Sequence, residues 1–151
     1  MKKITLVIFI NCLLITSSFG QTLFPDKFQG CNTERFGLES DTITARVSDQ
    51  HLISTITSSF DEKTQKKIRG KLTLQVLVEE DGTSCLLSLK NDTKVKTSKM
   101  NIKKAIDEQL QWDTLDERVS PVILLNFSQN GIAFKRLGMN ANKGVHELLN
   151  N

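Results

Sequence analysis

The stretch Lys71–Leu89 most constrains what this chain can fold into. Apolar residues alternate with polar ones along most of Leu72–Val78, and a period of two is typical of a strand with one buried face. Asp81-Gly82 follows, and glycine at such a turn accepts a positive φ without steric cost. A second apolar run, Cys85–Leu89, comes next. The pattern predicts an antiparallel β-hairpin.

A second hairpin is predicted closer to the C-terminus. Val122–Phe127 is apolar except for Asn126, and Ile132–Leu137 follows the turn dipeptide Asn130-Gly131. Pro121 stands before the third strand, where a missing N–H is tolerated. Because a strand this apolar is covered on both faces or is meant to be covered by a partner, Val122–Phe127 is also a candidate for binding.

An amphipathic helix is predicted ahead of each hairpin. Ser48 is suited to cap the first, whose apolar residues recur at helical spacing up to Phe60. The second lies within Met100–Trp112. Its expected buried stripe is Ile102, Ala105, Ile106 and Leu110. We therefore expect an α+β fold, a small two-layer sandwich of two helices against an antiparallel sheet of three to four strands, in the order α-β-β-α-β-β.

Residues 1–20 have the layout of a cleaved signal peptide. Lys2-Lys3 precedes a mostly apolar run, and Ser18 and Gly20 place small residues before the expected cleavage site. A membrane anchor needs about 20 apolar residues, whereas Asn11 interrupts a shorter run here. We expect cleavage after Gly20 and a periplasmic or secreted protein without membrane insertion. An extended arm at 21–47, a domain at 48–137 and a flexible tail at 138–151 complete the predicted organisation.

The charge of the predicted mature chain gives no electrostatic reason to expect nucleic acid as a partner. Residues 1–20 hold Lys2 and Lys3 and no acid, so 18 basic residues remain against 17 acidic ones. A nearly neutral domain lacks the field that attracts nucleic acid or an anionic membrane. The basic pI of the whole chain owes part of its value to the leader.

The mature chain keeps two cysteines, Cys31 and Cys85. In an oxidising compartment they could form a disulfide that closes a long loop. A buried thiol at Cys85, among leucines, and a free Cys31 in a mobile arm are the alternatives. The sequence leaves these open, because it does not place the two Cα atoms within bonding range.

No catalytic or metal-binding pattern emerges. His51 and His146 lie in different outlying segments, and neither has a Cys, His or carboxylate at metal-ligand spacing. Phosphate loops and nucleophile elbows are missing from the sequence. Glu79-Glu80-Asp81 is typical of a solvated hairpin turn and lacks a second catalytic group. We expect a non-enzymatic protein without cofactor or metal.

Several motifs occur in a fixed order. They are Gly70-x-Leu72-x-Leu74-x-Val76-x-Val78-x-x-Asp81-Gly82, then Ala105–Trp112, then Val122–Phe127 followed by Asn130-Gly131. This ordered set resembles the C-terminal domain of TonB-like proteins, and Phe28-Gln-Gly-Cys31 is similar to the Phe-Pro-Gly-Cys element ahead of that domain in some exported members. The chain departs from the family where Asp113-Thr114 follows Trp112. Because we expect residues 1–20 to be cleaved and no proline-rich stretch follows them in this sequence, we expect a protein without the TonB membrane anchor and spacer.

The resemblance implies a binding module whose sheet edge accepts an extended peptide from a protein partner in the cell envelope. We place this edge on the third strand. The candidate binding residues are Val122, Ile123, Leu124, Leu125, Asn126 and Phe127, with Leu124 and Asn126 on one face. The alternative is a small periplasmic inhibitor or immunity-type protein that plugs a partner enzyme with the charged loop Thr114–Arg118.

Overall fold

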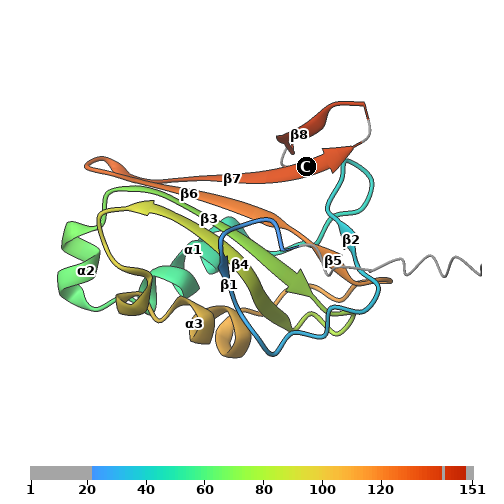
Figure 1. Cartoon of the computed structure of the whole chain (residues 1–151), viewed down its shortest axis with the longest axis horizontal. Coiled ribbons are helices and arrows are strands. Elements are labelled where there is room, and N and C mark those ends of the chain that lie inside the picture. Colours follow the sequence, from blue (N-terminus) through green and yellow to red (C-terminus); the bar gives the residue numbers. More distant parts are fainter. Residues whose placement is uncertain (1–21, 141, 149–151) are drawn as a thin grey trace, which may run out of the picture.

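One mainly antiparallel sheet dominates the protein (Figure 1). A computed structural model describes residues 22–140 and 142–148, so the signal peptide predicted at 1–20 lies outside the described residues. Among the described residues the sheet contains eight strands. Six of them follow the spatial order β1 (Asp26–Lys27), β4 (Ser84–Thr93), β3 (Gly70–Val78), β6 (Val122–Ser128), β7 (Gly131–Asn140) and β8 (Gly144–Glu147). Strands β2 (Gly37–Leu38) and β5 (Val119–Ser120) pair with each other at one end of the sheet, where β5 also contacts β3.

The first predicted hairpin is present. Strand β3 (Gly70–Val78) pairs antiparallel with β4 (Ser84–Thr93). Gly82, in the turn, has φ +82°, and a Cβ built there would lie 2.3 Å from the carbonyl oxygen of Trp112. Both the left-handed backbone and this close approach therefore require glycine at the position.

The second predicted hairpin is also present, and its first strand lies inside the sheet. Strand β6 (Val122–Ser128) pairs with β7 (Gly131–Asn140) in register from Val122 opposite Leu137 to Ser128 opposite Gly131. On its other side β6 pairs with β3, from Gly70 opposite Phe127 to Gln75 opposite Val122. This non-local pairing joins the two hairpins into one sheet.

Within the part of the chain that the structure describes, three short α-helices accompany the sheet. Helix α1 (Asp49–Ser58) is capped by the Ser48 hydroxyl, which accepts a hydrogen bond from the His51 N–H. Helix α3 (Ile102–Gln109) follows a single 3₁₀ turn, η1 (Thr97–Lys99). Helix α2 (Glu62–Lys67) is capped by the Asp61 carboxylate, which accepts a hydrogen bond from the Thr64 N–H. A cap of this kind supports a helix too short to show a periodic pattern.

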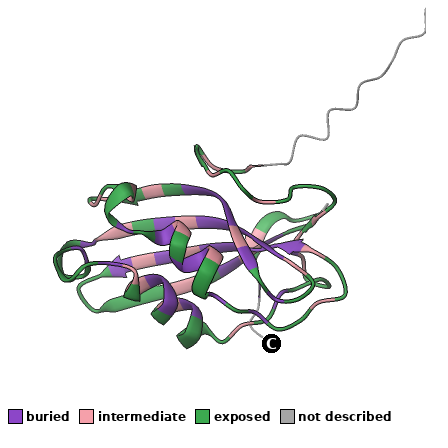
Figure 2. Cartoon of the chain, turned by 90° about the horizontal axis from the view of Figure 1, so that it is seen from below, coloured by how far each residue is buried: buried purple, intermediate pink, exposed green. Residues whose placement is uncertain are grey.

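The core lies between the sheet and the helices, where buried residues line the strands seen behind the helices in Figure 2. Alternate residues of β3 point into it, as the period of two predicted. The residues of β3 and β6 that belong to the core are Leu72, Leu74, Val76, Val78, Ile123, Leu125 and Phe127. The stripe of α3 predicted from helical spacing, Ile102, Ala105, Ile106 and Leu110, is buried as well.

The predicted sandwich of two helices on three to four strands is wrong, because the sheet has eight strands and is accompanied by three short helices. The arm supplies β1 (Asp26–Lys27), which pairs with β4, and β2 (Gly37–Leu38), which runs parallel to β5 (Val119–Ser120). The segment predicted as a flexible tail completes β7 and forms β8 (Gly144–Glu147). Strands of two to four residues carry too few positions for alternation to be visible, yet they satisfy backbone groups at the sheet margins.

Candidate functional site

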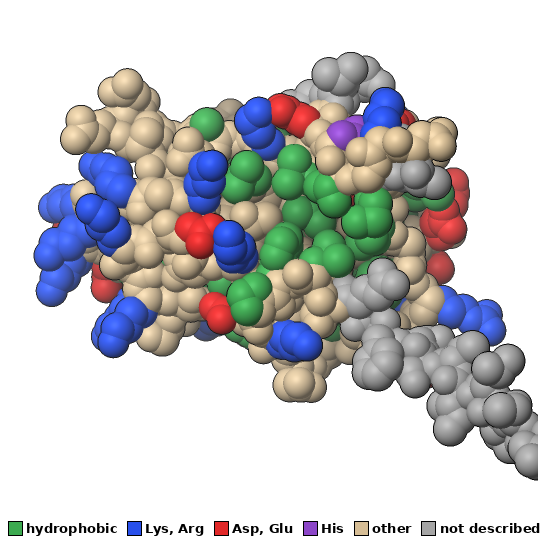
Figure 3. Space-filling view, turned by 45° about the horizontal axis from the view of Figure 1, so that its top comes forward, with side chains coloured by type: hydrophobic (Ala, Val, Ile, Leu, Met, Phe, Trp, Pro, Cys, Tyr) green, Lys and Arg blue, Asp and Glu red, His purple; other side chains and the backbone are tan. Residues whose placement is uncertain are grey.

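Strand β6, predicted to be the binding edge, is an internal strand. Its residues Val122–Phe127 pair with β3 on one side and with β7 on the other. No row of N–H groups is left for a guest strand, so the predicted location of the edge is wrong. Leu124 and Asn126 do lie on one face of the strand, as predicted. This face is turned away from the core, and both residues are half-buried. Hydrophobic side chains gather in the middle of the face shown in Figure 3.

The N-terminal arm covers part of the margin on the β4 side of the sheet. Strand β1 pairs with Ser88 and Leu89 of β4, and the Phe28 N–H donates to the Leu87 carbonyl at 3.0 Å. The arm also lies against the sheet before this point, because the Leu23 N–H donates to the Gln75 side chain at 2.8 Å. This margin is therefore occupied along its middle by the protein's own chain.

The opposite margin, on β7, is covered along only part of its length. Strand β8 pairs with Leu137–Asn140, and the Leu148 N–H donates to the Arg136 carbonyl at 2.9 Å. Along Gly131–Lys135 no strand pairs with the outer side of β7 within the described ranges 22–140 and 142–148. Because backbone groups alternate in direction along a strand and those of Arg136 face outward, the N–H and C=O groups of Ile132 and Phe134 face outward too.

A cavity of about 340 Å³ lies beside this exposed edge. Apolar walls come from Phe60, Ile68, Phe127 and Ile132, and residue Ile132 is 37% exposed. The rings of Phe60 and Phe127 are tilted against each other with centroids 6.0 Å apart. The polar and small residues of the lining are Thr57, Gln65, Arg69, Ser128, Gln129 and Gly131. We call this cavity the β7 groove.

The β7 groove carries a single charged lining residue, Arg69. The guanidinium donates to the Ile68 carbonyl at 2.6 Å, and no carboxylate in the described part of the chain forms an ion pair with it. Between residues 60 and 71 the chain has five basic side chains and two acidic ones. Lys and Arg side chains accordingly gather at the end of the molecule that carries α2 (Figure 3). The groove is a slot of mixed polar and apolar lining in a positive field.

No family model, curated protein or solved structure matches this chain. The interpretation of the site therefore depends on its geometry. No group of three His, Cys, Asp or Glu side chains among the described residues could hold a metal ion. No helix within residues 22–140 and 142–148 is long and apolar enough to cross a membrane.

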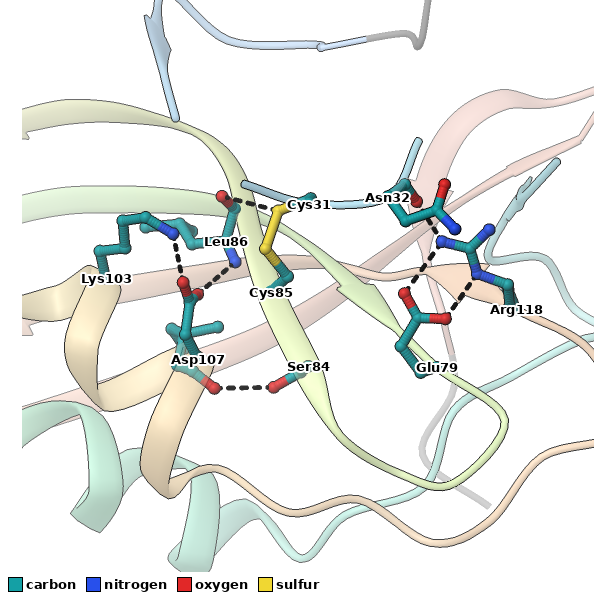
Figure 4. Close-up of a disulfide and its surroundings, with 10 residues drawn as sticks. Cys31, Asn32, Glu79, Ser84, Cys85, Leu86, Lys103, Asp107 and Arg118 are labelled. Carbon is teal, nitrogen blue, oxygen red and sulfur yellow. Dashed lines mark hydrogen bonds and ion pairs between the residues drawn. A yellow bond between two sulfur atoms is a disulfide. The ribbon is translucent and has the colours of Figure 1, made fainter. Parts of the chain in front are cut away.

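A disulfide joins Cys31 of the arm to Cys85 of β4, with the Cα atoms 5.7 Å apart (Figure 4). The alternatives of a buried thiol and a free thiol are thereby excluded. Beside the bond, Arg118 forms an ion pair with Glu79, Nε to Oε2 at 2.6 Å, and also donates to the backbone carbonyls of Asn32 and Glu34. Glu79 and Arg118, considered from sequence as an acidic turn and a charged loop, hold the arm against the sheet.

Glu39 and Arg136 form a second attachment of the arm. The Glu39 side chain is fully buried and that of Arg136 is 9% exposed, and Arg136 Nε lies 3.1 Å from Glu39 Oε2. The same guanidinium donates to the Ala45 carbonyl and stacks 5.1 Å from the centre of the Trp112 ring. Burial raises the pKa of Glu39, and the charge and hydrogen bonds of Arg136 oppose that shift. The pair fixes the arm to the inner face of β7.

Strand β8 is held by polar contacts that connect it to the arm and to β7. His146 Nε2 lies 2.9 Å from Asp41 Oδ1, and Nδ1 lies 3.0 Å from the Gly144 carbonyl. Lys135 on β7 pairs with Glu147 at 2.5 Å. The hydrogen bonds to Gly144 and Asp41 raise the pKa of His146, because both ring nitrogens donate only in the protonated ring.

We expect the His146 ring to titrate with a midpoint above 6.5, the ordinary value from which its pKa is raised. A group whose pKa is raised by folding contributes stability below its unfolded pKa and loses that contribution as the pH rises through its folded pKa. Asp41→Asn should lower the midpoint. An NMR titration of a His51→Gln variant, in which His146 gives the only histidine signal, measures it. An unchanged midpoint in Asp41→Asn would contradict the assigned contact.

The sequence predicted β7 as a strand but did not show that it lies at the margin of the sheet. Ile132–Leu137 was predicted as the last strand, and the alternation of β3 placed its core face correctly. The missing information was the neighbour of each strand, which depends on the pairing of β3 with β6 across about 50 residues. Arg69 was not singled out from the sequence, because local charge does not show which cavity a side chain lines.

Proposed function

We propose that this chain is an exported binding module that captures an extended peptide of a protein partner by strand addition along Gly131–Lys135 of β7. The main support for this proposal is that no described strand covers the outer side of this segment. Export is supported by the signal-like pattern of residues 1–20 and by the Cys31–Cys85 disulfide, since disulfides persist in extracellular or periplasmic compartments. The resemblance to TonB C-terminal domains stays a prediction.

The energetics of the edge show why the β7 groove matters. Ile132 and Phe134 could exchange about four backbone hydrogen bonds with a guest strand. At roughly 0.5–1.5 kcal/mol each, these contribute about 2–6 kcal/mol before the cost of ordering the peptide. Micromolar affinity needs about 8 kcal/mol. Burying one guest Leu or Phe side chain in the groove would add about 1.5–3 kcal/mol.

Two substitutions at Ile132 separate backbone from side-chain recognition. Ile132→Pro removes the outward N–H as well as the side chain, whereas Ile132→Ala removes most of the side chain and keeps the N–H. Neither change removes a hydrogen bond between β7 and β6, because the backbone N–H and C=O groups of Ile132 face away from β6. We expect peptides selected from a random displayed library on the wild-type protein to bind Ile132→Pro at least ten-fold more weakly than Ile132→Ala by calorimetry.

Thermal melts of both variants are the control for folding. Amide NMR shifts on peptide addition should be largest at Ile132 and Phe134. Equal affinities for the two folded variants, shifts confined to another surface, or a selection that yields no binder would each argue against strand addition at β7.

A further inference from the structure

The β7 groove limits which peptides the edge can hold, and the inference that follows rests on the proposed strand addition. A guest strand beside β7 sends alternate side chains to opposite faces of the sheet. Those on the helix side pass Ile132, whose side chain forms one wall of the groove. The other apolar walls, Phe60, Ile68 and Phe127, come from three further segments of the chain. A single guest side chain entering there would contact apolar side chains from several segments, in a lining that also carries polar groups.

Among the polar residues that line the groove, Arg69 is the one whose charge could discriminate between acidic and basic peptides. The Gln65 amide donates to the carbonyls of Thr57 and Phe60 and so connects α2 to the end of α1. Arg69 uses one bond to the Ile68 carbonyl, although a guanidinium has five N–H donors. Arg118 and Arg136, in contrast, both pair with carboxylates of the protein itself.

The surroundings of Arg69 reinforce its charge. Lys66 and Lys67 close α2, and Lys71 is the second residue of β3. The nearby acids are Asp61, whose carboxylate caps α2, and Glu62, which lies 3.9 Å from Lys66. A positive field of this kind favours acidic partners and repels basic ones. It is screened by salt because these side chains are exposed.

We infer that the β7 edge selects an acidic peptide with an apolar anchor: an extended segment that places an aromatic or branched side chain in the groove and a carboxylate against Arg69. Arginine binds a carboxylate with two parallel hydrogen bonds. A Glu or Asp side chain on the same face as the anchor supplies this group, and the terminal carboxylate of a peptide is the other source that the test has to exclude. The chemistry is the same, and the peptides below distinguish the two sources.

The test uses synthetic peptides and the full mature protein. Acetylated and amidated Thr-Glu-Thr-Phe-Thr-Glu-Thr presents the anchor flanked by carboxylates on one face, and its counterpart replaces both Glu by Lys. A third peptide replaces Phe by Ser. Thr-Gln-Thr-Gln-Thr-Phe, with a free or an amidated C-terminus, examines the terminal carboxylate. Calorimetry gives the affinity, and amide shifts of Ile132 and Phe134 report the location.

We expect the Glu peptide to bind at least ten-fold more tightly than its Lys counterpart, and the peptides with a free and an amidated C-terminus to bind alike. Replacing Phe by Ser should cost about 10-fold to 150-fold, the range for burying such a side chain. Arg69→Gln should reduce the preference for carboxylate to less than three-fold. Lys67→Gln, which makes the same charge change outside the groove lining, should retain it.

Equal binding of acidic and basic peptides, or an Arg69→Gln variant that behaves as Lys67→Gln does, would overturn the inference. If library-selected peptides still depended on the Ile132 N–H in that case, strand addition would stand and only the acidic preference would fall. If no peptide of either kind shifted the Ile132 and Phe134 signals, both the acidic preference and the proposed function would be rejected.

Discussion

Replacing both Cys31 and Cys85 by alanine is expected to lower the free energy of unfolding by about 4 kcal/mol. The disulfide connects residues 54 positions apart, and a cross-link of this span restricts the unfolded chain by roughly that amount in the chain-entropy model. The folded state loses something too, because Cys31 holds the arm at β4 beside the Arg118 contacts. Urea denaturation followed by circular dichroism measures the change.

The wild-type protein in excess reductant is the matched control for the alanine variant. Reduction removes the same covalent link without altering the side-chain carbons, so the two should unfold at similar urea concentrations. A loss below 1 kcal/mol in both would mean that the arm and β4 stay together in the unfolded state without the bond.

Arg136→Met is expected to destabilise the fold by about 3–5 kcal/mol at neutral pH. The substitution leaves the Glu39 carboxylate, whose side chain is fully buried, without its counter-charge. It also removes the stacking on Trp112 and the bond to the Ala45 carbonyl. The double variant Glu39→Met/Arg136→Met should recover much of the loss, because two apolar side chains need no counter-charge in this site.

The pH dependence gives this prediction a second measurement. Burial raises the pKa of Glu39 in the folded protein, and removal of Arg136 should raise it further. A carboxyl with a raised folded pKa contributes stability that is fully present below its unfolded pKa and is lost as the pH rises through its folded pKa. The defect of Arg136→Met should therefore be smaller at pH 5 than at pH 7. Urea denaturation at both values tests it. A pH-independent defect, or a double variant no more stable than the single one, would show that the lost stacking and packing dominate.

The parts of the fold that local chemistry determines could be predicted from the sequence. Alternation along Leu72–Val78 and the glycine of each turn identified both hairpins, and Ser48 marked the start of α1. The helical stripe from Ile102 to Leu110 identified the buried face of α3. Each of these signals lies within one element or one turn, where the period of the chain and the φ angle of glycine leave few alternatives.

The sheet margins could not be predicted, because they depend on contacts between distant segments. Nothing local in Gly37-Leu38 shows that it will pair with Val119-Ser120, or that Glu39 will meet Arg136. The β7 groove is built from residues of α1, α2, β6 and β7 and their flanks, so none of its walls is visible in one stretch of sequence. The apolar character of Val122–Phe127 was read as a surface for a partner, whereas the partners are β3 and β7 of the same chain.

The bond between Cys31 and Cys85 encloses α1, α2 and β3 within one covalent ring. A protease that cut the backbone once inside this ring, for example in the charged turn around α2, would not divide the molecule. The two fragments would remain linked, with β3 still hydrogen-bonded between β4 and β6, until a reductant opened the ring. Integrity in an environment rich in proteases therefore depends on the redox state as well as on folding.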